Sequence, residues 1–309
     1  MTDETIDGAN TDAEPRCYRH PDRESHIKCT RCDRPICPDC MVTAPVGFQC
    51  PECVHRAAAS SRPARTVAGG ALHRDSALVT KVIVAANVLV YVVNLLVGDW
   101  LFNDYAMQGA AVAVDGESYR LVSSAFLHTG FTHLAFNMIA LWFIGAAVEA
   151  RLGRWRYLAV YLLSALGGSV LSYAVDSPLQ TSVGASGAVF GVFGALFVLS
   201  VKLRFELGGL IALIVINAVI GFIPGLNINW RAHLGGLIVG ALLTTVMVYA
   251  PQRSRLVSSV VACVVVFVAL IGVTVVRSNE ISDCTVDGPG SEAFYDPVCM
   301  AGITRIGDL

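Results

Sequence analysis

The sequence predicts an all-α polytopic membrane protein with a small zinc-stabilised domain near its N-terminus. Hydrophobic residues form 54% of the 309 residues and charged residues only 15%, whereas a soluble domain carries roughly 25% charged residues. Apolar runs long enough to cross a bilayer recur from Ala77 onward. Seven of the ten cysteines lie between residues 17 and 53. The net charge of -2 and the pI near 6.4 give no basis for binding nucleic acid.

Composition divides the chain into six segments. The content of Ala, Ser, Arg and Pro after the cysteine-rich segment is typical of a flexible linker. The predicted segments are a disordered N-terminus (1–16), a zinc-binding domain (17–55), a linker (56–77), a six-helix membrane core (78–250), a seventh transmembrane helix (251–277) and an extracytoplasmic tail (278–309).

Four ligand pairs, each separated by two residues, occur in the cysteine-rich segment. They are Cys17 and His20, Cys29 and Cys32, Cys37 and Cys40, and Cys50 and Cys53. A two-residue spacer lets both side chains turn onto one ion, and tetrahedral zinc takes four such ligands. The eight residues therefore predict two structural zinc ions in closed sites. Disulfides are the alternative, which is disfavoured because a cytoplasmic domain keeps its thiols reduced.

Seven apolar segments have the length of membrane-spanning helices, which need roughly 17 to 25 residues. They lie near 78–98, 132–150, 156–175, 184–201, 207–223, 231–250 and 256–276. A long loop separates the first from the second. Glycine and alanine are dense in the third, fourth and sixth segments, which allows close contact between helix backbones.

Charges in the loops predict the orientation of these helices, because Lys and Arg next to a span favour the cytoplasm. The basic residues between the helices fall on one side: Arg151, Arg154, Arg156, Lys202, Arg204, Arg253 and Arg255. The acidic residues gather on the other side: Asp99, Asp104, Asp115, Glu117 and Asp176, then Glu280, Asp283, Asp287, Glu292 and Asp296 in the tail. The N-terminal residues also lack the charged and apolar run of a secretory signal. We therefore expect a multi-pass protein of the cell membrane with its N-terminus in the cytoplasm and its C-terminus outside. A disulfide between Cys284 and Cys299 is expected in the tail, because the surroundings outside the cell are oxidising.

Polar side chains cluster at the outer ends of three apolar helices. Ser186 lies in the sequence Gly-Ala-Ser-Gly (184–187) at the start of one helix. The glycines leave room for a substrate backbone, and the free N–H groups of a helix start can hold an oxyanion. A serine in a membrane helix more often bonds back to a carbonyl. However, His233 lies at the same level of another helix, and an intramembrane histidine indicates a functional site.

The chemistry predicted for this cluster is a two-residue dyad, in which His233 takes the proton of Ser186. No Asp or Glu lies in the outer half of a nearby helix to form a third member. Phe190, one turn after Ser186, is predicted to lie against the imidazole, with ordinary core packing as the alternative. Glu149 lies at an inner helix end and is predicted to bind arginines or backbone.

The second apolar helix adds further polar groups near its outer end. His133 and Asn137 are four residues apart and share a face. An imidazole N–H and an amide are suitable donors to an oxyanion. His128 precedes them, and we favour interfacial anchoring for it over a direct role in the chemistry.

The joint order of these motifs resembles the rhomboid intramembrane serine proteases. The motifs are GxSG at 184–187, AHxxGxxxG at 232–240, and HxxxN at 133–137 preceded by His128. The resemblance covers roughly 78–250. It implies a six-helix core with an outward-facing Ser186–His233 dyad, an oxyanion hole from His133, Asn137 and the Ser186 backbone, and substrates that are transmembrane helices cut near their outer ends. The chain departs from the family where Phe190 replaces the Tyr of many bacterial members, and where Tyr119-Arg120 replaces a frequent Trp-Arg.

The order of the ligand pairs resembles a B-box-type zinc finger, in which alternate pairs share a metal. The resemblance implies one zinc held by Cys17, His20, Cys37 and Cys40 and another held by Cys29, Cys32, Cys50 and Cys53. The last pair departs from the pattern because B-boxes commonly have histidines there, and His26 and His55 are the candidate substitutes for a weaker ligand.

The function predicted from these features is hydrolysis of peptide bonds in or near transmembrane segments, with no cofactor for catalysis. The expected partners are transmembrane protein substrates, the lipid bilayer and a cytoplasmic protein that binds the zinc domain. A metal-held cap without a partner is the alternative for that domain. A non-catalytic relative that binds transmembrane clients is the alternative for the whole chain, and it is disfavoured because both dyad residues are present. A transporter or channel would show charges at midplane depth and internal repeats, which the sequence lacks.

Overall fold

The computed structural model describes residues 14–60, 65–73, 75–98, 100–221, 228–287 and 293–295. The chain divides into two compact units, Met1–Pro63 and Ala64–Leu309. We call the first the N-terminal unit and the second the membrane unit.

The N-terminal unit has little regular structure and a core made mostly of cysteine. Its elements are the 3-10 helix η1 (Pro38–Cys40), the antiparallel strands β1 (Val42–Thr43) and β2 (Phe48–Gln49), and helix α1 (Pro51–Ser60). Ile36 is fully buried among six buried cysteines. A core this small gives too little apolar burial to hold a fold by itself, so the unit needs staples or a metal.

The membrane unit is a bundle of apolar helices. Six described helical segments are long and apolar enough to cross a membrane. They are α2 (Leu78–Val97), the continuous segment Phe131–Leu152, α8 (Arg154–Val175), α9 (Ser186–Leu203), α11 (Trp230–Tyr249) and α12 (Arg255–Ser282). The segment Phe131–Leu152 consists of α6 (Phe131–Ala140), a π-helical turn η3 (Leu141–Gly145) and α7 (Ala146–Leu152). The prediction of an all-α polytopic membrane protein is confirmed.

Two of the seven predicted spans have described bounds that differ from the expectation. Helix α10 (Gly208–Gly221) is apolar and has 14 described residues, while the predicted end at residue 223 lies outside the described part of the chain. Helix α12 extends to Ser282, beyond the predicted end at residue 276. The helix continues because the charged Arg277 is buried against backbone carbonyls of α8 instead of ending the span.

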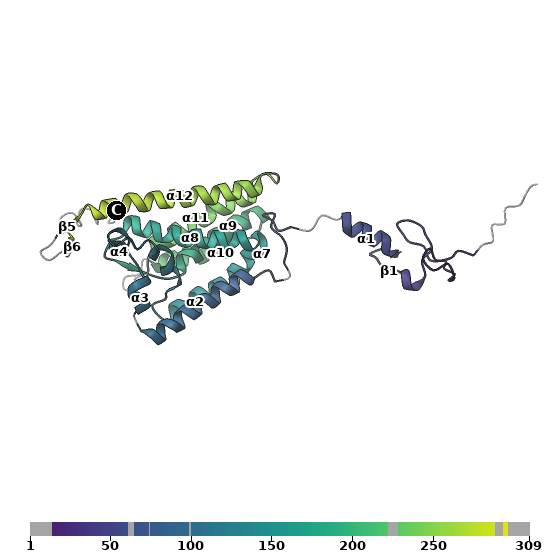
Figure 1. Ribbon diagram of the computed structural model, residues 1–309, viewed down its shortest axis with the longest axis horizontal. Coiled ribbons are helices and arrows are strands. Elements are labelled where there is room, and N and C mark those ends of the chain that lie inside the picture. Colours follow the sequence, from purple (N-terminus) through teal and green to yellow (C-terminus); the bar gives the residue numbers. More distant parts are fainter. Residues whose placement is uncertain are drawn as a thin grey trace, which may run out of the picture. The chain divides into compact units, whose positions relative to one another are not determined.

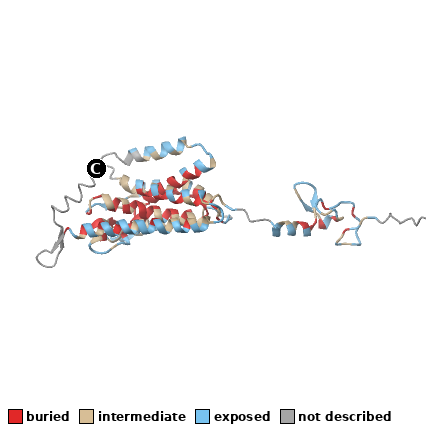
Figure 2. Ribbon diagram, turned by 90° about the horizontal axis from the view of Figure 1, so that it is seen from above, coloured by how far each residue is buried: buried red, intermediate tan, exposed pale blue. Residues whose placement is uncertain are grey.

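Helices α8, α9 and α11 form the centre of the bundle and lie between α2 and α12 (Figure 1). Figure 2 shows that buried residues concentrate in these central helices. A Cβ atom on Gly236 would lie 1.8 Å from the carbonyl oxygen of Gly187, and one on Gly240 would lie 2.0 Å from that of Gly191. Glycine is therefore required where α9 and α11 cross, since their backbones touch.

The predicted long loop before α6 contains short elements. They are α3 (Trp100–Tyr105), β3 (Met107–Gln108), α4 (Gly109–Ala113), α5 (Arg120–Ser123) and the 3-10 helix η2 (Ser124–Phe126). Strand β3 pairs with β4 (Thr181–Ser182), which leads into α9. The buried Arg120 donates to the carbonyls of Asn103 and Ala106 and pairs with Glu117. One arginine thus satisfies two backbone carbonyls and orders the loop.

The segment expected as a flexible linker, 56–77, is partly structured. Helix α1 extends to Ser60, and residues 65–73 lie against the end of α7 at Arg151 and Leu152. Thr66 Oγ1 donates to the carbonyl of Leu152 at 3.3 Å, and the Ala68 amide donates to that of Arg151 at 3.3 Å. Composition could not reveal this because the contacts use backbone groups and small side chains.

Glu149 has the structural role predicted for it. Its carboxylate accepts hydrogen bonds from the amides of Val79 and Thr80 and from the Thr80 hydroxyl, at 2.8 to 3.0 Å. Glu149 is 1% exposed. A carboxylate at a helix start satisfies free N–H groups there, so Glu149 caps α2.

The described part of the tail is a short antiparallel pair, β5 (Thr285–Asp287) and β6 (Ala293–Tyr295). Cys284 before it is buried and disulfide-bonded. Cys299, the expected partner, lies outside the described residues, as do most of the predicted disordered N-terminus and the acidic residues Asp99, Glu292 and Asp296.

Candidate active site and metal centres

Ser186 is the first residue of α9, as the Gly-Ala-Ser-Gly sequence predicts. Gly184 has φ +124°, and a Cβ atom there would lie 2.6 Å from Cε1 of His133 and 3.7 Å from Oγ of Ser186. Only glycine fits this backbone and leaves space for the imidazole. Gly184 therefore brings His133 and the Ser186 hydroxyl close to one point.

His233 lies in the first turn of α11 and is 8% exposed. Its ring stacks on Phe190 with centroids 4.2 Å apart and planes at 8°. The prediction that Phe190 lies against the imidazole is confirmed. Among the described residues, Nδ1 of His233 has no hydrogen-bond partner.

Backbone contacts between α9 and α11 place the serine and histidine at the same end of the bundle. Gly187, next to Ser186, approaches the carbonyl of Ala232, next to His233, since a Cβ on Gly187 would lie 3.3 Å from that oxygen. Gly236, one turn after His233, touches the Gly187 carbonyl. The glycines on both helices thus set how near the two side chains lie.

His133 and Asn137 share a face of α6 beside this site. Thr129 Oγ1 lies 3.2 Å from Nδ1 of His133, and the Asn137 amide donates to the His133 carbonyl at 2.9 Å. Asn137 is 6% exposed. Its amide is therefore occupied by backbone and would have to rotate to reach a ligand.

His128 is buried against His133, with ring centroids 5.0 Å apart. Neither of its ring nitrogens has a partner among the residues that the structure describes. Burial, with a smaller contribution from His133, lowers the pKa of His128 to about 4. The ring is therefore neutral at pH 7, because burial disfavours the charged form.

A cavity of about 220 Å³ borders His128 and Thr129. Asn94 of α2 and Phe102 of α3 also line it. Sequence reasoning missed both residues, since neither belongs to a motif and the short helices of the loop were not expected. The cavity has room for several waters next to Thr129, which contacts His133.

The sequence also gave no role to Asn229 and placed Asp176 in a loop. Asn229 is the N-cap of α11, and its side-chain oxygen accepts from the Ala232 amide at 3.0 Å. Asp176 is the C-cap of α8 and is 6% exposed. Asparagine four residues before His233 was a detectable capping signal, whereas the burial of Asp176 was not detectable.

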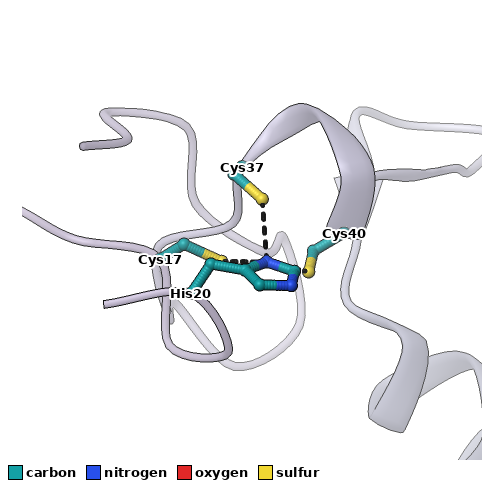
Figure 3. A group of neighbouring side chains, drawn as sticks. All are labelled: Cys17, His20, Cys37 and Cys40. Atoms are coloured by element: carbon teal, nitrogen blue, oxygen red, sulfur yellow. Dashed lines mark hydrogen bonds between the residues drawn. The ribbon is translucent and has the colours of Figure 1, made fainter. Parts of the chain in front are cut away.

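The N-terminal unit brings four predicted metal ligands to a common centre (Figure 3). They are Cys17, His20, Cys37 and Cys40, whose ligand atoms all lie within 4.8 Å of one another. Nδ1 of His20 is 3.9, 3.3 and 3.4 Å from the sulfurs of Cys17, Cys37 and Cys40, respectively.

The other four predicted ligands form a second group, Cys29, Cys32, Cys50 and Cys53. The sulfurs of Cys32 and Cys50 lie 3.8 Å apart. Arg34 donates to both of these sulfurs and pairs with Glu52. Its positively charged guanidinium group therefore lies beside the four cysteines. The two groups have the alternate pairing that the B-box resemblance implies. His26 instead pairs with Glu24.

The donor sets fit metal ions and do not fit disulfides. All seven cysteines of the unit are free thiols. Tetrahedral zinc bonds of about 2.0 to 2.3 Å place ligand atoms roughly 3.5 to 3.8 Å apart, and the three His20–sulfur distances and the Cys32–Cys50 distance agree within a few tenths of an ångström. Each group could therefore hold one structural metal ion.

The bundle and the polar residues at one of its ends define a multi-pass membrane protein with a buried polar site. Residues 115–250 match the family model of the Rhomboid domain. The chain therefore contains a rhomboid domain, preceded by Cys/His groups consistent with a zinc finger.

Several curated proteins are similar to this part of the chain. The rhomboid protease GluP of Bacillus subtilis is 42% identical over 117 residues, which are 36% of this chain and 23% of that protein. The putative rhomboid protease YdcA of the same species is 41% identical over 95 residues, covering 31% and 47%. The rhomboid protease AarA of Providencia stuartii is 28% identical over 187 residues, covering 51% and 65%. The chain thus spans less than half of the first two relatives.

Proposed function

We propose that the chain is an intramembrane serine endopeptidase that hydrolyses peptide bonds in or near transmembrane segments. The observation that carries the proposal is that Ser186 begins α9, while His233 in the first turn of α11 stacks on Phe190, one turn after Ser186. The similarity to proteins named rhomboid proteases supports it.

The proposed reaction has two steps. The Ser186 hydroxyl oxygen attacks the scissile carbonyl carbon while His233 takes the hydroxyl proton, and His233 then gives this proton to the leaving amine. Water next attacks the resulting ester, His233 takes a proton from it, and the serine is released with its proton restored. His233 acts without a carboxylate partner, in agreement with the unpartnered Nδ1 in the described structure.

The oxyanion formed in each step would be held by N–H groups around Gly184. His133 lies against Gly184 on the same side as the Ser186 hydroxyl. The backbone amide of Ser186 is among the free donors of the α9 start. Asn137 joins them once its amide leaves the His133 carbonyl. Such donors each contribute a few kcal/mol when water is excluded.

The proposed substrates are transmembrane helices cut near their outer ends, with water supplied through the polar cavity at His128 and Thr129. The proposed orientation places the N-terminal unit in the cytoplasm, supported by the basic residues at the inner loops. Zinc is the proposed metal of both groups because their ligands are soft thiolates and one imidazole. A cytoplasmic protein is the proposed partner of this unit.

The test is cleavage of a tagged single-span substrate by the full chain in liposomes. We expect cleavage by the wild type and none by Ser186→Ala or His233→Ala. Ser200→Ala is the matched control, because Ser200 is a buried serine at the opposite end of α9, and it should cleave like the wild type. Substrate that binds to the wild type without being cut would support a non-catalytic client-binding protein instead.

A further inference from the structure

A buried hydrogen-bond network surrounds the carboxylate of Asp176. The side chain is 4% exposed. Oδ1 accepts from Nη1 of Arg231 at 2.9 Å, and Oδ2 accepts from the Ser172 hydroxyl at 2.6 Å and the Asn229 amide at 2.8 Å. Both oxygens therefore have partners, as a buried carboxylate requires.

Asn229 connects this carboxylate to the helix turn that carries His233. Its side-chain oxygen accepts from the Ala232 amide at 3.0 Å, and its backbone carbonyl accepts from the His233 amide at 3.3 Å. The same side-chain amide that binds Asp176 lies 3.4 Å from the Ser182 hydroxyl. A shift of Asp176 would thus be transmitted to the first turn of α11.

The network also borders the segment that leads to the nucleophile. Ser182 ends β4 and pairs with Met107 of β3. Two residues later the Gly184 amide donates to the carbonyl of Ser124 at 2.9 Å, and Ser186 follows. The segments before Ser186 and before His233 therefore meet at the same hydrogen bonds.

Helix α12 joins the network through Arg277, which is 4% exposed. Its Nε donates to the Tyr173 carbonyl at 3.3 Å and its Nη2 to the Asp176 carbonyl at 3.5 Å. Nη1 pairs with Glu280 at 3.1 Å. A charged residue this deep in a bundle is costly unless it is bonded, so α12 is fixed to the end of α8 at this point.

We infer that Asp176 is a positioning residue, which fixes the first turn of α11 and so holds His233 against Ser186, and that Arg277 extends this support to α12. The inference rests on the proposed function. It gives α12, which lies outside the matched rhomboid domain, a part in the geometry of the site.

The first test measures kcat and KM of the full chain in liposomes. Asp176→Asn keeps the size of the side chain and removes the charge that pairs with Arg231. We expect kcat to fall about 10- to 100-fold with KM changed less than about twofold, because a displaced general base slows chemistry more than binding. Glu149→Gln is the matched control, since Glu149 is an equally buried carboxylate at the other end of the bundle, and its kcat should stay near wild type.

A second pair of variants tests the part of α12. Arg277→Met should lower kcat by a smaller factor, about 3- to 10-fold, because it frees a carbonyl of the network and leaves the carboxylate in place. Arg255→Met is its control on the same helix, since Arg255 donates to the carbonyls of Ala250 and Val67 at the opposite end. An equal loss of kcat in Arg277→Met and Arg255→Met would overturn the role of α12.

A readout without cleavage separates this inference from the proposed function. The histidine ring resonances are recorded by NMR in protein with isotope-labelled histidines, and the resonance that disappears in His233→Ala is assigned to His233. This resonance should shift in Asp176→Asn and stay unchanged in Glu149→Gln. An unshifted resonance, or wild-type kcat in Asp176→Asn, would overturn the inference. If the resonance shifts in Asp176→Asn but the wild type never cleaves the substrate, the proposed function is removed and the positioning role stands.

Discussion

The N-terminal unit and the membrane unit place opposite kinds of residue at their centres. The first buries metal-ligand groups around one large apolar residue, Ile36. The second buries glycines where helix backbones touch, as at Gly187 and Gly236. Polar ligands are at the centre of the unit with the smaller core, and small apolar residues are at the centre of the unit that lipid surrounds.

The difference follows from the solvent of each unit. In water, a unit with 47 described residues lacks the apolar area to offset its loss of conformational entropy, so ligand bonds must supply the rest. In lipid, apolar burial drives little association between helices, and close packing takes its place. Each unit should therefore fail under a treatment that leaves the other intact.

Metal removal should have the largest effect and act only on the N-terminal unit. Binding of structural zinc contributes about 10 to 16 kcal/mol in small zinc fingers. This exceeds the free energy of folding that a unit of this size obtains without metal. We expect a zinc chelator to expose residues 14–60 of the full chain to protease while the helices of the membrane unit remain protected. Loss of two zinc ions per chain should accompany the cleavage. Protease resistance of 14–60 after complete zinc loss would contradict the role given to the metals.

A side chain at the crossing of α9 and α11 should have the next largest effect, on the other unit. Gly236→Val places methyl groups where a Cβ already lies 1.8 Å from the Gly187 carbonyl, and we expect a loss of at least about 4 kcal/mol. Gly272→Val is the control, because a Cβ on Gly272 meets nothing within 4 Å. Thermal unfolding in liposomes measures the loss, and the zinc content should stay the same in both variants. Equal melting temperatures for the two variants would show that the crossing tolerates side chains.

The two units also differ in how far the sequence predicts them. The candidate ligands in the N-terminal unit follow from the spacing of the cysteine pairs, because several pairs with two-residue spacers in one short segment are typical of zinc sites. Their grouping into two sets came only through the B-box resemblance, since spacing alone does not say which pairs meet. The structure brings Cys17 to Cys37 and Cys29 to Cys50 through contacts that are distant in sequence.

In the membrane unit, hydropathy predicts the helices well and their surroundings poorly. The apolar run places α8 within two residues of its observed start, Arg154. The sequence predicts a loop position for the buried Asp176 and only the end of the last helix for the buried Arg277, because local composition cannot show that a neighbouring helix provides their partners. The motif residues Ser186 and His233 could be found from sequence, and the network beneath them could not.

The smallest effect expected is a dependence of stability on pH that belongs to the membrane unit alone and acts through His128. Its folded pKa of about 4 lies below the unfolded value of 6.5, so the unfolded chain binds the proton more readily. The contribution of neutral His128 is therefore complete above pH 6.5 and is lost as pH falls toward 4, by about 3 kcal/mol at most. We expect the melting temperature of the wild type in liposomes to fall over this range more steeply than that of His128→Gln, which carries no titrating ring.

His73→Gln is the control for this pH dependence. His73 is exposed and lies outside the helices, so this variant should retain the wild-type dependence of melting temperature on pH. If the melting temperature of His128→Gln falls with pH as steeply as that of the wild type, other groups cause the acid sensitivity of the bundle. Protonation of the buried His128 ring would then not change the free energy of unfolding.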